Sequence, residues 1–474
     1  MTPEPTTSSR LRIATAAAGA IILALGVGIL VWRVRGSRPN VLLITVDTLR
    51  ADRLGAYGST LTRTPNLDRL ASQGTLFENA SCPMPMTRPS LFSILTSRYP
   101  REHGVVNNSV SLPDRGLLLP EVFRAAGYRT AAFVGVQLLS EDAGFGRGFD
   151  RFEMPEQRRE ERAEWVIDRA LAWIRAQDAS KPLFVWIHLF DPHMPYAPPA
   201  PFGPPGEPSV ISWFYLESLA GDSGNVPKAT LERAIELYDG EIEYTDSALG
   251  KLFGALGDGK LLDRTIVAFT ADHGECFSHG IYFEHSDCLY EDALHVPLIL
   301  RHPGDIPAGA RATQLAEHRD LGPTLLALAH VPAPATFGGH PLLPASTRGD
   351  GTEETGLVQL PLYQEKAAEG RSKKHSRLRS VAGEPTRPLV IEQQSVGLRS
   401  RAWKYIVTGT QEELYDLTSD PEEAHDLSAS RPEVLARFRS DIAEKLRAHP
   451  LDLPAPSVVN DRLRATLHAL GYVE

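Results

Sequence analysis

Short runs of apolar residues alternate along the chain with longer stretches in which apolar residues recur every three or four positions. The run NVLLITVD, residues 40–47, is almost wholly apolar up to its last residue, which is typical of a strand buried on both faces of a parallel sheet. Similar strand patterns lie at 129–136, 182–191 and 265–272, and helical patterns lie at 67–74, 119–128, 161–177 and 229–257. This alternation predicts an α/β fold, a doubly wound and mainly parallel sheet with helices on both faces.

The pattern changes near residue 345. Charged and polar residues dominate the next stretch, and strand patterns then follow at 388–400 and 403–409, with a helical pattern at 432–449. We therefore predict a main α/β domain at 39–345 and a smaller C-terminal α+β subdomain at 346–474.

The N-terminal segment differs from both. Residues 13–32 carry no charge and are long enough to cross a bilayer, with arginines on either side. We predict that residues 1–38 form a short cytoplasmic stub and a membrane anchor. A cleaved signal peptide is the alternative, and the flanking charges are too evenly balanced to orient the segment.

The charge and the cysteine content limit the classes of partner and of site that we expect. The formal net charge is -10, and the one strongly basic run, 371–379, reads as a solvated loop, so we expect no nucleic-acid partner. The three cysteines, Cys82, Cys276 and Cys288, have no spacing that indicates a disulfide framework or a cysteine metal site, and we expect them to be buried small residues.

Polar residues stand at the ends of three predicted strands: Asp47 with Thr48, His188 with Asp191 and His193, and Asp272 with His273. Ligands bind beyond the carboxyl ends of strands in such a sheet, so Asp47, Asp272 and His273 are candidate ligands of one divalent metal ion. Carboxylates suit Ca²⁺ or Mg²⁺, and the imidazole moves the preference toward Mn²⁺ or Zn²⁺. The alternative is that each Asp only caps the element that follows it.

The stretch MPMTRPSLFSILTSRYP, residues 84–100, predicts a helix whose first turn contains Pro89. Thr87 lies just before that proline, where a hydroxyl can cap the helix. The same position suits a nucleophile, because a helix N-terminus favours an anionic ester and an adjoining metal lowers the pKa of a hydroxyl.

Several segments, in order along the chain, resemble the sulfatase family of the alkaline-phosphatase superfamily. They are NVLLITVDTLRADRLGAYG at 40–58, TRPSLFSILTSRYPREHGV at 87–105, HLFDPHMPYAPP at 188–199, YDGEIEYTD at 238–246, FTADHGE at 269–275, LYEDALHVPLIL at 289–300 and EELYDLTSDPEEAHDL at 412–427.

The resemblance implies roles for particular residues. Asp47, Asp272 and His273 fall on metal-ligand positions, and Thr87 falls on the nucleophile position. The resemblance also implies substrate contacts, which are His193 as a binding or proton-transfer group, His103, Asn108, and His285 in place of an expected lysine.

Three departures from the family pattern affect the chemistry. Family sulfatases carry Cys or Ser at the Thr87 position, oxidised to formylglycine, and threonine cannot form that aldehyde. Leu91 stands where the family has the supporting Arg, and Thr48 stands where many sulfatases have a second acidic residue. One metal ion is expected, because DPHMP lacks the spacing of a second metal site.

We therefore predict a metal-dependent hydrolase of a small anionic ester (sulfate, phosphate or phosphonate), anchored in the membrane with its catalytic domain outside the cytoplasm. A phosphoethanolamine-type transferase and a non-catalytic binding protein with the same fold are the alternatives. The alcohol part of the substrate and the oligomeric state stay open.

Overall fold

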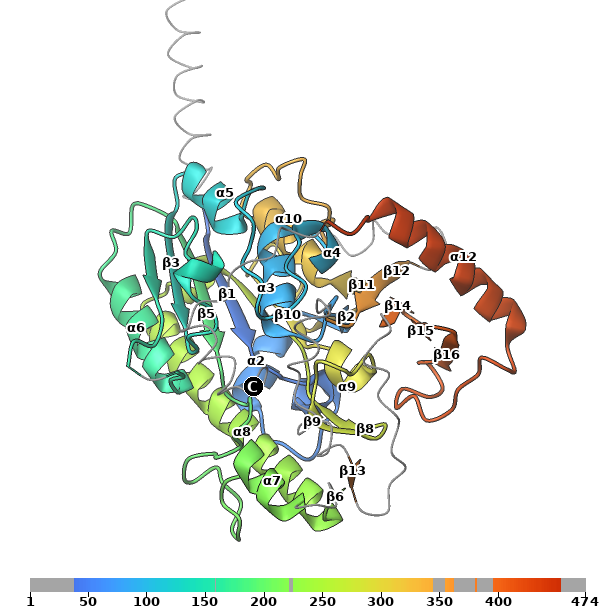
Figure 1. The fold of residues 1–474 in the computed structure, drawn as a ribbon. Helices are drawn as coiled ribbons and strands as arrows, with labels where there is room; N and C mark the ends of the chain where they lie inside the picture. Colours follow the sequence, from blue (N-terminus) through green and yellow to red (C-terminus); the bar gives the residue numbers. More distant parts are fainter. Residues whose placement is uncertain are drawn as a thin grey trace, which may run out of the picture.

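The computed structural model describes residues 38–157, 159–220, 225–343, 354–361, 380–381 and 395–452. Its largest sheet has eight strands in the order β11-β2-β10-β7-β1-β5-β3-β4 (Figure 1). The strands are β1 (Asn40–Val46), β2 (Thr75–Ser81), β3 (Arg129–Val134), β4 (Arg151–Glu153), β5 (Leu183–Leu189), β7 (Thr265–Ala271), β10 (Leu298–Arg301) and β11 (Ala310–Glu317). All neighbouring pairs are parallel except those of β10 with β2 and β7. The predicted mainly parallel α/β sheet is confirmed.

Helices cover both faces of this sheet. One layer contains α2 (Pro65–Ser72), α6 (Ala163–Arg175) and α8 (Lys228–Asp258), and the other contains α3 (Thr87–Thr96), α5 (Leu119–Ala125) and α10 (His318–Leu328) (Figure 1). The remaining helices are α4 (Pro100–His103), α7 (Trp213–Ala220), α9 (Glu291–Leu294) and α12 (Pro432–Ala448), with short turns η1 (Ala51–Arg53), η2 (Gly55–Tyr57), η3 (Glu141–Ala143) and η5 (Leu262–Arg264). Two small pairings complete the described elements: β6 (Asn225–Val226) with β13 (Ser380–Val381), and β8 (Cys276–Ser278) with β9 (Ile281–Glu284).

The core explains why the central strands are so apolar. Every residue of β1, β5 and β7 is buried, because helices exclude water from both faces of the sheet. Trp186 on β5 lies in an aromatic cluster with Phe145 and Phe149, and each such buried ring contributes about 1.5–3 kcal/mol of apolar transfer free energy. The three polar strand ends are thereby held on a rigid frame.

A second, antiparallel sheet forms the C-terminal part of the fold. Its strands are β12 (Thr355–Gln359), β14 (Ser395–Ser400), β15 (Trp403–Thr408) and β16 (Gln411–Asp416), in the order β12-β14-β15-β16. Phe438 of α12 is buried with Tyr405 and Leu414 in a core separate from the main one, which confirms the smaller α+β subdomain. The predicted boundary at 345/346 lies outside the described residues and stays a prediction.

The predicted anchor at 13–32 and the basic run at 371–379 also lie outside the described ranges. Among the helices inside those ranges, none combines the length and the apolar character needed to span a bilayer.

Candidate active site

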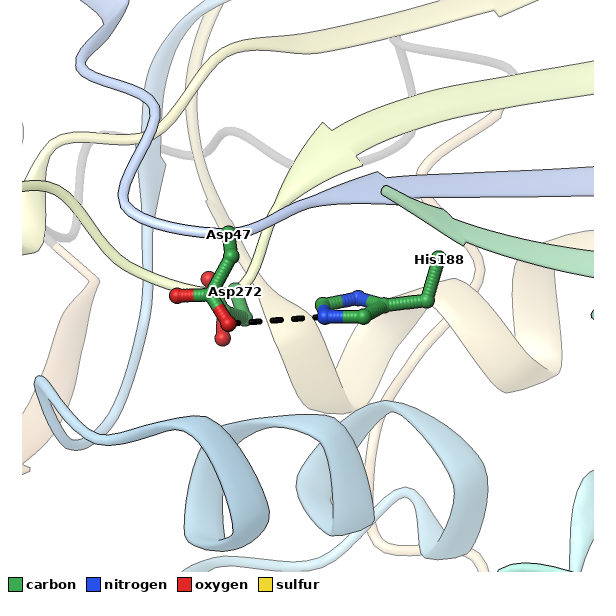
Figure 2. A group of neighbouring side chains, drawn as sticks. All are labelled: Asp47, His188 and Asp272. Atoms are coloured by element: carbon green, nitrogen blue, oxygen red, sulfur yellow. Dashed lines mark ion pairs between the residues drawn. The ribbon is translucent and has the colours of Figure 1, made fainter. Parts of the chain in front are cut away.

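Three polar side chains meet where the central strands end. Asp47 follows β1, Asp272 follows β7, and His188 is the next-to-last residue of β5. Because β1 pairs in parallel with both neighbours, Val46 lies opposite Ala271 on one side and Leu189 on the other. This register brings the three side chains together, and their potential ligand atoms all lie within 4.8 Å of one another (Figure 2). The group could hold a metal ion.

His273 lies beside this group, on the Asp272 side. Its Nε2 lies 3.4 Å from Oδ2 of Asp272 and 3.8 Å from Oδ1 of Asp47. Its Nδ1 lies 2.9 Å from the carbonyl oxygen of Gly274, which assigns the ring proton to Nδ1 and the lone pair to Nε2. The structure therefore brings together all three predicted metal ligands.

The carboxylates lack the donors that buried anions need. Both oxygens of Asp47 and Oδ2 of Asp272 have no hydrogen-bond partner within the described part of the chain, and both residues are fully buried. Burial raises the pKa of Asp47 to about 8, and burial together with the charge of Asp47 raises the pKa of Asp272. Since unpaired buried carboxylates are costly, these residues fit a divalent cation better than an ion-free site.

Thr87 lies at the edge of this group. It is the first residue of α3, after Met86 at the N-cap, and no side-chain hydrogen bond caps the helix from the N-cap. Its Oγ1 lies 3.5 Å from Nε2 of His273, and the residue is fully buried. The hydroxyl thus lies beside the candidate metal ligands.

The cap role belongs instead to Asn108. Its Oδ1 accepts a hydrogen bond of 2.9 Å from the backbone N–H of Arg88, one of the first free N–H groups of α3. Its buried Nδ2 has no hydrogen-bond partner among the described residues. Asn108 therefore stabilises the start of the helix and keeps a donor for another group.

His103 lies behind α3. Its Nε2 is 3.1 Å from Oγ of Ser93, and its Nδ1 accepts a 3.2 Å hydrogen bond from the backbone N–H of Val105. Burial lowers its pKa to about 3, so the ring is neutral. Both ring nitrogens have protein partners, so His103 supports α3, and its direct substrate contact stays a prediction.

Two more predicted histidines line the other side of the site. The ring of His285 stacks on that of His273, with centroids 4.3 Å apart, and lies 5.7 Å from that of His193. Burial by itself lowers the pKa of His285, but the carboxylate of Glu275, 3.1 Å away, reverses this and raises it to about 9. Burial, reinforced by the charge of His285, lowers the pKa of His193 to about 3. The pKa values of the two rings are thus shifted in opposite directions.

A disulfide holds the segment that carries these groups. Cys276 follows Glu275, and it is bonded to Cys288, three residues after His285. All three cysteines are buried, as expected, but the spacing gave no sign of this disulfide, and only Cys82 is free among the described cysteines. The two cysteines are twelve positions apart, and the fold of the β8–β9 hairpin, rather than a sequence motif, brings them together.

A cavity of about 690 Å³ opens beside His193. Phe190, Trp213 and Phe214 give it aromatic walls, and Glu160, Asp191 and Glu241 together with Arg162 give it charged ones. Phe214 is 81% exposed. A mixed aromatic and charged cavity next to the site is suited to the organic part of a substrate.

The C-terminal subdomain contacts the helix α9, which is hydrogen-bonded to the residue after His273. Lys404 of β15 is fully buried, with its Nζ 2.7 Å from Glu291 and 2.9 Å from Glu423. Glu291 begins α9, and the backbone N–H of Gly274, next to His273, donates to the carbonyl oxygen of Ala293 in that helix. Lys404 of the second sheet is thus connected through α9 to Gly274, the residue after the candidate ligand His273.

A family model described as Sulfatase matches residues 39–331, more than half of the chain. The chain belongs to the sulfatase family. Arylsulfatase K of Rattus norvegicus is 25% identical over 483 residues, an alignment that covers 91% of this chain and 80% of the relative. As a member of this family the protein is a hydrolase.

Solved structures agree on the sulfatase fold. A protein in complex with its substrate D-glucosamine-2-N,6-O-disulfate gives a TM-score of 0.70 at 20% identity, over 87% of this chain and 98% of its own. The phosphonate monoester hydrolase of Agrobacterium radiobacter gives 0.67 at 22% identity, over 87% of this chain and 95% of its own.

One member of the site was not among the predicted ligands. His188 was noted only as a polar residue near a strand end, yet it faces Asp47. The position of His188 follows from the parallel register, in which His188 lies directly opposite Thr45 on the neighbouring strand, two residues before Asp47.

Proposed function

We propose that this sulfatase-family protein hydrolyses a small anionic ester, a sulfate, phosphate or phosphonate, with Thr87 as the nucleophile. The observation that carries the proposal is the position of the Thr87 hydroxyl, 3.5 Å from Nε2 of His273 and free of a capping role. A fully buried hydroxyl at a helix start, beside unpaired carboxylates, has no structural function that the described contacts explain.

Asp47, Asp272 and His273 would hold the divalent cation. When bound, such a cation lowers the pKa of an adjoining hydroxyl and neutralises charge on an ester. The chain itself also stabilises the anionic ester, because the N-terminus of α3 offers partial positive charge and free N–H groups to an anion.

The reaction has two steps. First, a bond forms between Oγ1 of Thr87 and the sulfur or phosphorus atom, the bond to the alcohol oxygen breaks, and the proton of the hydroxyl ends on the departing alcohol. Then water cleaves the Thr87 ester, which releases the sulfate, phosphate or phosphonate anion and restores the hydroxyl. Phosphoryl or phosphonyl transfer suits this route, because a threonine ester of sulfate lacks the hydrate collapse by which formylglycine expels sulfate.

Three side chains are proposed to bind the ester. His285, held by Glu275, provides a cationic donor, His193 borders the alcohol side, and Nδ2 of Asn108 provides a neutral donor at the helix start. The alcohol would occupy the cavity lined by Trp213 and Phe214.

We also propose that residues 13–32 anchor the protein with this domain outside the cytoplasm. The Cys276–Cys288 disulfide supports that side of the membrane, because disulfides persist in oxidising compartments. The chain enters the domain at the amino end of β1, whereas Asp47 lies at its carboxyl end.

The test uses the full chain, purified in detergent, stripped of metal and reloaded separately with Ca²⁺, Mg²⁺, Mn²⁺ or Zn²⁺. It is assayed on 4-nitrophenyl sulfate, 4-nitrophenyl phosphate, bis(4-nitrophenyl) phosphate and 4-nitrophenyl phenylphosphonate, beside Thr87→Ala. Turnover of at least one ester that depends on both metal and Thr87 is expected. Turnover unchanged in Thr87→Ala would refute the nucleophile, and no turnover with any metal would favour a binding protein.

A further inference from the structure

Thr48, next to the candidate metal ligand Asp47, carries no charge. Thr48 stands beside Asp47, where the family pattern places an acidic residue, and its hydroxyl adds no negative charge. Its backbone is already engaged, because its N–H donates to Oδ1 of Asp272 at 3.2 Å and its carbonyl oxygen accepts from the hydroxyl of Tyr238 at 2.6 Å. The site thus has one carboxylate fewer than the resemblance to many sulfatases implies.

An imidazole occupies the neighbouring space. Nε2 of His188 lies 3.5 Å from Oδ2 of Asp47, and both side chains have no exposed surface. This nitrogen has no hydrogen-bond partner within the described residues. The 3.5 Å separation is longer than a hydrogen bond of about 2.7–3.2 Å. It is within the separation that two ligands of one ion can have, which for bonds of about 2.1 Å is at most roughly 4.2 Å.

Strand β1 orients the ring from its other nitrogen. Nδ1 of His188 lies 2.9 Å from Oγ1 of Thr45. That hydroxyl also accepts a 3.0 Å hydrogen bond from Nε1 of Trp186. If Thr45 accepts the Nδ1 proton of His188 as well, the lone pair of the ring falls on Nε2. Metal-binding histidines are typically held in this way through the nitrogen that does not bind the metal.

We propose that His188 is a fourth protein ligand that takes the place of the acid missing at Thr48, and that the resulting set favours Zn²⁺ or Mn²⁺ over Ca²⁺ and Mg²⁺. The set would be two carboxylates, Asp47 and Asp272, and two imidazoles, His188 and His273. Imidazole suits zinc, a mixed shell of carboxylates and imidazoles can also hold manganese, and Ca²⁺ and Mg²⁺ prefer shells of oxygen ligands.

A competing explanation is an ion-free pair in which His188 only accompanies a protonated Asp47. Burial lowers the pKa of His188 to about 4 and raises that of Asp47 to about 8, which is compatible with such a pair. That pair, however, leaves both oxygens of Asp47 and Oδ2 of Asp272 without hydrogen bonds, whereas one cation would satisfy all of them. The two explanations differ in what His188 does to metal binding.

Calorimetric titration of the metal-stripped full chain in detergent tests the proposal without turnover. Wild type is expected to bind one Zn²⁺ or Mn²⁺ more tightly than Ca²⁺ or Mg²⁺. His188→Ala is expected to weaken Zn²⁺ binding by more than about 100-fold, since loss of an outer-shell partner alone costs about 10–100-fold. The double variant Thr48→Asp with His188→Ala is expected to move the preference toward Ca²⁺ or Mg²⁺.

His302→Ala is the matched control, because its imidazole pairs with Asp305 away from the site and its loss is expected to leave the metal affinity unchanged. A second measurement needs no variant. Proton NMR of the Co²⁺-loaded wild type counts ligated imidazoles by their shifted ring N–H signals, and two signals are expected. One signal, or Zn²⁺ affinity in folded His188→Ala within about threefold of wild type, overturns the proposal. Because the proposal shares only its metal ligands with the proposed function, an inactive protein that binds Zn²⁺ through two imidazoles refutes the esterase and not the ligand.

Discussion

The hydroxyl oxygen of Thr87 lies 3.5 Å from Nε2 of His273, although the two residues are 186 positions apart in the chain. A nucleophile in this position forms a covalent ester during turnover. Acid quenching of the reaction with a phosphate or phosphonate ester, followed by peptide mass spectrometry, is expected to find the substituent on the peptide that contains Thr87. Thr87→Ala should lower kcat by at least about 10³-fold and leave no adduct. An adduct on another residue contradicts the assignment.

Metal removal should destabilise the protein, because the charges of Asp47 and Asp272 then lose the cation that offsets them. A ligand that binds only the folded state adds about 2.7 kcal/mol of stability at 100 times its Kd. Thermal unfolding of wild type, with chelator and with metal at that ratio, is expected to show this gain. In Asp47→Asn the gain should be largely lost, and an equal gain in both proteins would place the metal elsewhere.

The cavity beside His193 should select the alcohol part of the ester. Phe214 lines it and is 81% exposed, so truncation removes contact area for a bound alcohol without opening the core. Phe214→Ala is expected to lower kcat/KM for 4-nitrophenyl esters by about 10-fold, in keeping with 1–3 kcal/mol for a small apolar contact. The methyl ester of the same acid serves as the control and should change little. An equal loss with both esters indicates a general disturbance instead.

Lys404 should be important for stability although it is far from the nucleophile in sequence. It has no exposed surface and lies between Glu291 and Glu423, so Lys404→Met leaves two buried carboxylates with less compensation. The expected loss is about 3–5 kcal/mol in the free energy of unfolding, measured by denaturant titration. Arg439→Met breaks the half-exposed pair with Glu412 and should cost much less, because solvent screens an exposed pair. Similar losses in both variants would contradict the argument.

The same cluster predicts a pH dependence. Burial by itself raises the pKa of Glu291, but the charges of Arg399 and Lys404 lower it well below its ordinary value near 4.5. Below pH 4.5 the Glu291 carboxylate takes up a proton more readily in the unfolded chain than in the folded one. The stability that the ionised Glu291 contributes is therefore present above pH 4.5 and is lost as the pH falls below it. Unfolding titrations between neutral pH and the acid limit should give a shallower acid decline for Glu291→Gln than for wild type. Equal slopes would exclude Glu291 as a source of the acid sensitivity.

Local patterns were sufficient for the framework of this protein. The apolar run 40–47 forms β1 with Asp47 at its carboxyl end, and the stretch 229–257 lies in α8. Both could be predicted because a strand buried on two faces is continuously apolar, whereas a helix buried on one face has apolar residues every three or four positions. The helix at 432–449 was confirmed as α12. The meeting of Asp47 with Asp272 also followed from sequence, since parallel strands end at the same edge of a sheet.

Only the tertiary structure decided which groups touch across that edge. The approach of His188 to Asp47, the pairing of Cys276 with Cys288 and the burial of Lys404 between two glutamates depend on strand register and on elements far apart in the chain. Periodicity describes which face a residue occupies, and it carries no information about the partner on that face. The sequence by itself thus determined the central strands β1, β3, β5 and β7, most of the helices that cover the sheet and the candidate nucleophile. Packing decided that His188 lies beside Asp47 and that Lys404 lies beside Glu291 of α9.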